Sequence, residues 1–182
     1  MFEKIINFFI IFFAVLLQMS VFPNIFFLGI SPNLAMDLVI FWVVYEGFEG
    51  AFFKIILTGF ILDLVSFHPI GINIIIFSII AFLTSIFSKR LFAFGIWRTI
   101  ILMLFVMIGT GINEIGTFFL FKAIEYFKGI KEAENIFFIL NRNVFFSEVC
   151  LNILFFFLIV FLIVKIEKFF NLYKNKKNSN YA

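Results

Sequence analysis

The sequence predicts an all-α integral membrane protein built as a bundle of six transmembrane helices. Of its 182 residues, 64% are hydrophobic and only 14% are charged, whereas a soluble domain has about 45–50% apolar and about 25% charged residues. The chain also divides into six apolar runs, separated by segments that hold most of its charges, prolines and glycines. Too few polar residues remain to cover a soluble globule, so we expect lipid to surround most of the surface.

The six spans are defined by where these runs begin and end. The first is too long for the apolar region of a signal peptide and no cleavage site follows it, so we expect an uncleaved helix that ends at Pro23. Ser31 and Pro32 suit the N-cap and the first position of the second helix. The spans are expected at about residues 5–22, 32–45, 51–66, 70–88, 99–121 and 144–164.

The connections are expected to be short, with one exception. Residues 46–50 (Glu-Gly-Phe-Glu-Gly) predict a turn, and Pro69 separates the third span from the fourth. Residues 122–143 carry apolar side chains at helical spacing with charges between them, a pattern typical of an amphipathic helix on the outer interface. A solvated extension of the fifth span explains the same pattern, so both interpretations stay open.

The basic residues predict the orientation. Ten of the 14 Lys and Arg residues fall on the side of the two termini, and four fall on the other side. Because basic residues are enriched on the cytoplasmic side of a membrane, we expect both termini in the cytoplasm. Residues 165–182 form a basic tail, which we expect to attract anionic lipid head groups.

An acidic residue near the end of the third span is the most unusual feature of the chain. Asp63 follows Gly59 by four residues and precedes Ser66 by three, so the three share one helix face. A carboxylate in such an apolar run is costly, and we expect Ser66 and the backbone of the turn around Pro69 and Gly71 to hydrogen-bond to it. The functional alternatives are a partner contact, an ion site or a proton-linked group.

Other polar residues lie inside the apolar runs. Asp37 comes one turn into the second span, and we interpret it as an interfacial acid favoured by the positive end of the helix dipole. The remaining ones are expected to form hydrogen bonds between helices; they are Gln18, Asn73, Asn113, Glu114 and Asn152.

The residues of the chain do not combine into a familiar catalytic site. It has one histidine, His68, and one cysteine, Cys150, which argues against a zinc or haem site. The sequence Gly109-Thr-Gly111 lacks the spacing of a phosphate-binding loop. We therefore expect no enzymatic activity, no cofactor and no nucleic-acid partner.

Three short elements occur in an order and spacing that resemble one family. They are Pro32-Asn33-Leu34, Gly59-x-x-x-Asp63-Leu-x-Ser66 and Pro69-x-Gly71. With the chain length and the number of spans, they resemble the MreD family, the rod shape-determining proteins of the bacterial inner membrane. The resemblance is sharpest between residues 31 and 90. Members of that family often carry Asp at the position of Asn33. In this chain the nearby acid is Asp37, one turn further along.

The resemblance implies a non-enzymatic scaffold of the cell-wall elongation complex, needed for rod shape and lateral peptidoglycan synthesis. It implies MreC as a direct partner and, through MreC, the filament protein MreB, RodA and a class B penicillin-binding transpeptidase. It also implies a fold similar to the substrate-binding subunits of energy-coupling-factor transporters. The alternative is a substrate-binding subunit of a vitamin transporter. Such subunits commonly carry Ala-x-x-x-Ala in the first helix, where this chain has only Ala14.

Overall fold

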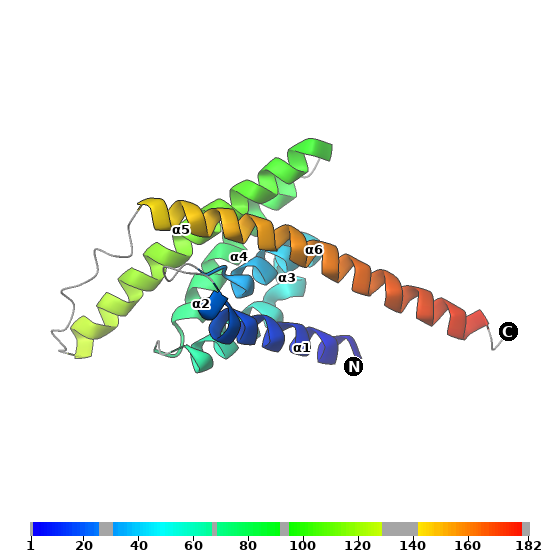
Figure 1. The fold of residues 1–182 in the computed structure, drawn as a ribbon, viewed down its shortest axis with the longest axis horizontal. Helices are drawn as coiled ribbons and strands as arrows, with labels where there is room; N and C mark the ends of the chain where they lie inside the picture. Colours follow the sequence, from blue (N-terminus) through cyan, green and yellow to red (C-terminus); the bar gives the residue numbers. More distant parts are fainter. Residues whose placement is uncertain (1, 26–30, 67–68, 92–94, 129–141, 180–182) are drawn as a thin grey trace.

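The computed structural model describes residues 2–25, 31–66, 69–91, 95–128 and 142–179. Every regular element in these ranges is helical, as predicted (Figure 1). Three stretches are long and apolar enough to cross a membrane, namely Ile5–Ile25, Ile100–Ile124 and Phe145–Lys165. The elements are α1 (Phe2–Leu16), a π-helical turn η1 (Leu17–Val21), α2 (Phe22–Ile25), α3 (Leu34–Val65), α4 (Ile72–Leu91), α5 (Gly95–Lys128) and α6 (Arg142–Ser179).

The first helix continues past Pro23, where the sequence predicted its end. The Phe22 N–H donates to the Leu17 carbonyl five residues earlier, so the turn just before the proline is π-helical and contains one residue more than an α-helical turn. A proline ring clashes with the carbonyl four residues before it in a regular α-helix. The π-turn changes the hydrogen-bond pattern at this point, and the helix reaches Ile25.

α3 is interrupted once, at Gly47, where φ is 79° and ψ is 171°. The Lys54 ammonium is paired with Glu46 and lies 5.2 Å from the centre of the Trp42 ring. Residues 42 and 54 would be about 18 Å apart in a straight helix, so the chain folds back at Gly47. We call residues 34–46 the first arm and residues 48–65 the second arm. The predicted turn at residues 46–50 is therefore present, but only Gly47 leaves the helical conformation.

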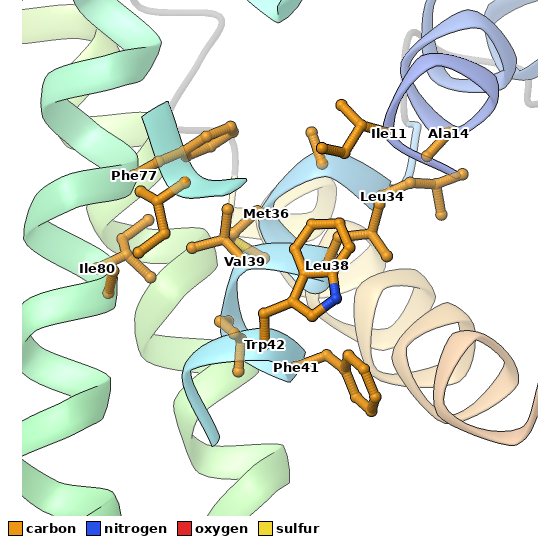
Figure 2. Close-up of a cluster of buried hydrophobic side chains, with 14 of the residues drawn as sticks. Ile11, Ala14, Leu34, Met36, Leu38, Val39, Phe41, Trp42, Phe77 and Ile80 are labelled. Carbon is orange, nitrogen blue, oxygen red and sulfur yellow. The ribbon is translucent and has the colours of Figure 1, made fainter. Parts of the chain in front are cut away.

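The first arm is the centre of the bundle. All ten residues from Leu34 to Val43 are buried, and a helix that is buried on every side lies within a core. In the view of Figure 2, side chains of this arm lie between Ile11 of α1 on one side and Phe77 of α4 on the other. α3 contacts α1, α4, α5 and α6.

Large apolar side chains cover the outside of the bundle. Among them, Phe13, Phe53, Phe119 and Phe161 are each at least 60% exposed. Such a surface suits lipid, in which exposed apolar side chains carry no penalty. α1 and α6 both have their chain ends toward the same end of the molecule (Figure 1).

Two helices extend beyond their predicted limits. α5 continues through residues 122–128, and α6 continues through residues 165–179 of the basic tail. The rest of the predicted amphipathic segment, residues 129–141, lies outside the described residues.

Candidate functional site

The turn between α3 and α4 is organised around Asp63. One carboxylate oxygen accepts from the Gly71 N–H at 2.7 Å, and the other accepts from the Asn73 N–H at 3.0 Å and from the Asn73 side chain at 2.8 Å. The first N–H groups of a helix have no partner within that helix. Asp63 therefore supplies the N-terminus of α4 with acceptors from a neighbouring helix, and its negative charge is favoured there.

Gly59 allows the two helices to approach each other one turn before Asp63. A Cβ atom on Gly59 would lie 2.7 Å from the Cα and 2.8 Å from the nitrogen of Ile74. No side chain fits at those distances, so the glycine brings the second arm against the start of α4. Gly71, with φ at 108°, adopts a conformation that favours glycine, and the Ile75 N–H donates to its carbonyl.

The prediction that the turn backbone satisfies Asp63 is confirmed, whereas the prediction for Ser66 is wrong. Ser66 ends α3: its N–H still donates to the Leu62 carbonyl at 2.8 Å, and its ψ of 147° turns the following chain out of the helix. Its Oγ is buried without a hydrogen-bond partner among the described residues. Pro69 contributes its carbonyl to the turn by accepting from the Ile72 N–H at 3.4 Å, and His68 lies outside the described residues.

The start of α3 has a different cap from the one expected. Asn33, and not Ser31, is the N-cap: its side chain accepts from the Met36 N–H at 3.0 Å. Asparagine is a strong N-cap residue, and Pro32 precedes it as a buried residue outside the helix. Leu34, the first helical residue, is 5% exposed and belongs to the core.

Two side chains from other helices complete this cap. Gln18 in the π-turn accepts from the Ala35 N–H at 3.0 Å, and Asn152 of α6 accepts from the Asn33 N–H at 2.7 Å. The Asn152 amide also donates to the Thr110 hydroxyl of α5 at 2.9 Å. The hydrogen bonds expected for Gln18 and Asn152 are therefore present, and they join four elements at one helix start. In the sequence, the sign of this cluster is that polar residues occur inside apolar runs. Nothing in the sequence indicates that these residues contact one another.

Asp37 is more deeply placed than an interfacial acid, so that interpretation is wrong. Its side chain is 0% exposed, and both carboxylate oxygens are without a hydrogen-bond partner among the described residues. The physical reason is that residues 34–43 of the first arm are all enclosed by other helices, so the first turn of α3 does not reach the surface. Asn113 Oδ1, on α5, is also buried without a partner.

A second acidic contact joins α5 and α6. The Glu114 and Glu148 side chains lie close to each other, and both are partly exposed. Glu114 is four residues after Thr110, and Glu148 is four residues before Asn152, so the two contacts lie one turn apart on antiparallel helices.

The hydrogen bonds at the two helix starts thus form two sites. One is the Asp63 turn, and the other is the cluster of Gln18, Asn33, Thr110 and Asn152 around the start of α3, on which Asp37 also lies. Within the described part of the chain, no three His, Cys, Asp or Glu side chains are placed to hold a metal ion together.

Comparison of the chain with protein-family models, with curated proteins and with solved structures found no match.

Proposed function

We propose that this protein is a non-enzymatic membrane scaffold of the bacterial cell-wall elongation complex, of the MreD type. The observation that carries the proposal is the role of the shared sequence elements in the fold. Asn33 caps α3, Gly59 allows the close approach of α3 and α4, and Asp63 caps α4. These residues fix where α3 and α4 begin and how closely they pack. Such roles are expected of a sequence signature that preserves the shape of a binding surface.

We propose six membrane crossings with both termini in the cytoplasm of the inner membrane. Three crossings are the long apolar helices, and α4 offers the shorter apolar stretch Ile72–Ser88. The two arms of α3 supply the other two: the first arm is about 20 Å long and the second about 27 Å. Both are shorter than the hydrocarbon core of about 30 Å, and the enclosed position of the first arm removes its need to match the lipid. We propose in addition that the fold is similar to that of the substrate-binding subunits of energy-coupling-factor transporters.

The partner implied by the resemblance is MreC, which would connect the protein to MreB, RodA and a class B penicillin-binding transpeptidase. A scaffold needs a rigid surface more than a reactive group. The two buried caps support this role, because each fixes a helix start through hydrogen bonds from other helices. The basic C-terminal tail would add contacts with anionic lipid.

Depletion of the protein tests the proposal. We expect depleted cells to lose rod shape and lateral wall synthesis while their vitamin uptake is unchanged. Cells that keep their shape and fail to import a vitamin would show that the protein is a transporter subunit instead. Affinity purification of the full chain should recover an MreC-like protein.

Two variants of the chain sharpen that experiment, one at the Asp63 turn and one matched control on α6. Asp63→Leu should fail to restore shape because α4 loses its cap, whereas Cys150→Ala, at an exposed position on α6, should restore it. Protein levels in the membrane are measured for both variants, so that a loss of folded protein is distinguished from a loss of partner binding.

A further inference from the structure

Asp37 is the one buried carboxyl group in the described residues that no donor satisfies. Its side chain is 0% exposed and neither oxygen accepts a hydrogen bond. Asp63, the other deeply buried acid, accepts three. An ionised carboxylate without a partner is strongly disfavoured in an apolar interior, so Asp37 requires a counter-charge or a proton.

The position of Asp37 on α3 shows which helices face it. Asp37 follows Asn33 by four residues and precedes Ile40 by three, and Met36 precedes Ile40 by four, so these residues form one stripe of the first arm. Met36 and Ile40 contact α5, because a Cβ atom on Gly109 would meet their side chains at 3.3 and 3.1 Å. Asn33 contacts α6 through the amide of Asn152. Asp37 therefore lies on the face of α3 that packs against α5 and α6.

This face is rich in oxygen atoms that accept hydrogen bonds. Asn113 comes one turn after Gly109 on α5, and its Oδ1 is also buried and unpartnered. Thr110, beside Gly109, donates its proton to the Val106 carbonyl and accepts from the Asn152 amide, which leaves one lone pair of its oxygen. Three buried acceptor atoms on α3 and α5 are therefore unpartnered among the described residues: two belong to Asp37, and one belongs to Asn113, one turn from the contact of Gly109 with α3.

Few other charged groups face Asp37. Among the described side chains, α1, η1, α2 and α4 contribute none. On α3 itself, Asp63 is bound to α4, and the remaining charges lie near Gly47 at the other end of the first arm. Those on α5 and α6 are Glu114, Lys122, Glu148 and Lys165.

We propose that Asp37 and the neighbouring amide and hydroxyl oxygens of α3 and α5 bind a small monovalent cation, either a proton or Na⁺. Asp37 is closed to solvent, which argues against an organic ligand or a side chain of a partner. The buried atoms without a partner on Asp37 and Asn113 are all acceptors, which argues against an anion. The proposal does not depend on a role in wall synthesis, and a failure of either proposal leaves the other unaffected.

The test is the folding equilibrium of the purified full-length chain in mixed micelles. Unfolding is followed by circular dichroism from mildly acidic to mildly alkaline pH without Na⁺, and then over a range of NaCl concentrations at constant ionic strength, with choline chloride as replacement. A cation that binds only the folded state shifts the equilibrium toward it by mass action. At saturation we expect about a tenfold shift in the folded-to-unfolded ratio for each tenfold change in cation activity.

The pH series and the NaCl series together identify the cation. A response to acid alone assigns a proton, and a response to NaCl at fixed pH assigns Na⁺; either supports the proposal. Asp37→Asn should remove the response. If that variant does not fold, the double variant Glu114→Gln/Glu148→Gln, which removes the other acids of α5 and α6, should keep the wild-type response.

Three results would overturn the proposal. The first is a wild-type equilibrium that depends neither on pH nor on NaCl. The second is an Asp37→Asn variant that responds as strongly as the wild type. The third is a double glutamine variant that loses the response, because the Glu114–Glu148 pair would then be its source.

Discussion

Replacing Gly59 with alanine tests whether backbone contact between α3 and α4 holds the Asp63 turn together. The new Cβ atom would lie 2.7 Å from the Ile74 Cα, and an ordinary contact begins at 3.4 Å. α4 would have to move by about 0.7 Å, and backbone atoms cannot rotate away as a side chain can. The move would stretch the hydrogen bonds from Asn73 to Asp63, which start at 2.8 and 3.0 Å.

The expected cost combines two terms. Overpacking a well-packed contact costs about 1–3 kcal/mol, and the weakened hydrogen bonds to a carboxylate add about 1–2 kcal/mol. Alanine recovers about 1 kcal/mol of helix propensity. We therefore expect Gly59→Ala to lower the free energy of unfolding by about 1–4 kcal/mol.

The assay is denaturant unfolding of the purified protein in mixed micelles, with two matched glycines of α5 as controls. At Gly116 the new Cβ would meet only the flexible Ile76 side chain, at 3.3 Å, and at Gly111 only the Phe145 ring, at 3.8 Å. Gly111→Ala should be neutral or stabilising, and Gly116→Ala should fall between the other two. Equal stability of Gly59→Ala and Gly111→Ala would refute the reasoning.

Three further predictions concern single residues, and a fourth concerns topology. Asp63→Leu should destabilise the protein by about 3–5 kcal/mol in the same unfolding assay, since three donors lose their acceptor; Asp63→Asn keeps one oxygen and should cost about half as much, and equal costs would show that the charge itself matters. Asn152→Leu should cost about 1–3 kcal/mol, because the Asn33 N–H and the Thr110 hydroxyl lose a partner, while Cys150→Ala on the same helix should cost nothing measurable. Gly47→Ala should cost about 1–2 kcal/mol, because φ at 79° strains any residue with a Cβ atom; an unchanged midpoint would contradict this. A reporter fused after Ala182 should read cytoplasmic, and a periplasmic reading would overturn the proposed six-crossing topology.

The helical class and the approximate position of each helix were predictable because they depend on local composition. Apolar runs indicate segments that lie in lipid or in the core, and the polar interruptions indicate segments that contact water. The folding back of α3 at Gly47 was predictable for the same reason, since a Glu-Gly-Phe-Glu-Gly segment interrupts the apolar pattern. The continuation past Pro23 was not, because the π-turn that accommodates the proline leaves no mark in composition.

The polar sites were only partly predictable, because a hydrogen bond needs a partner that the chain brings from elsewhere. Asp63 accepts from residues 71 and 73, which the sequence placed in the next turn. The N–H of Asn33 is bound by Asn152, 119 positions later, and no local pattern indicates that pairing. The burial of Asp37 was missed for a related reason: its distance from the helix start suggested an interface, but only the packing of four other elements shows that the start itself is enclosed.

The polar residues of this bundle separate into two groups by what they bind. Gln18, Asn33, Asp63 and Asn152 all accept from backbone N–H groups at the first turns of α3 and α4. Those groups have no partner within their own helix, and a membrane supplies no water to bind them, so a fold requirement accounts for these four side chains. The same requirement does not account for Asp37, since it binds no backbone group and lies beyond the N–H groups that need a cap. A carboxyl group that the fold does not use, in a place where the fold makes it costly, is for this reason the position at which a function beyond structural support is expected.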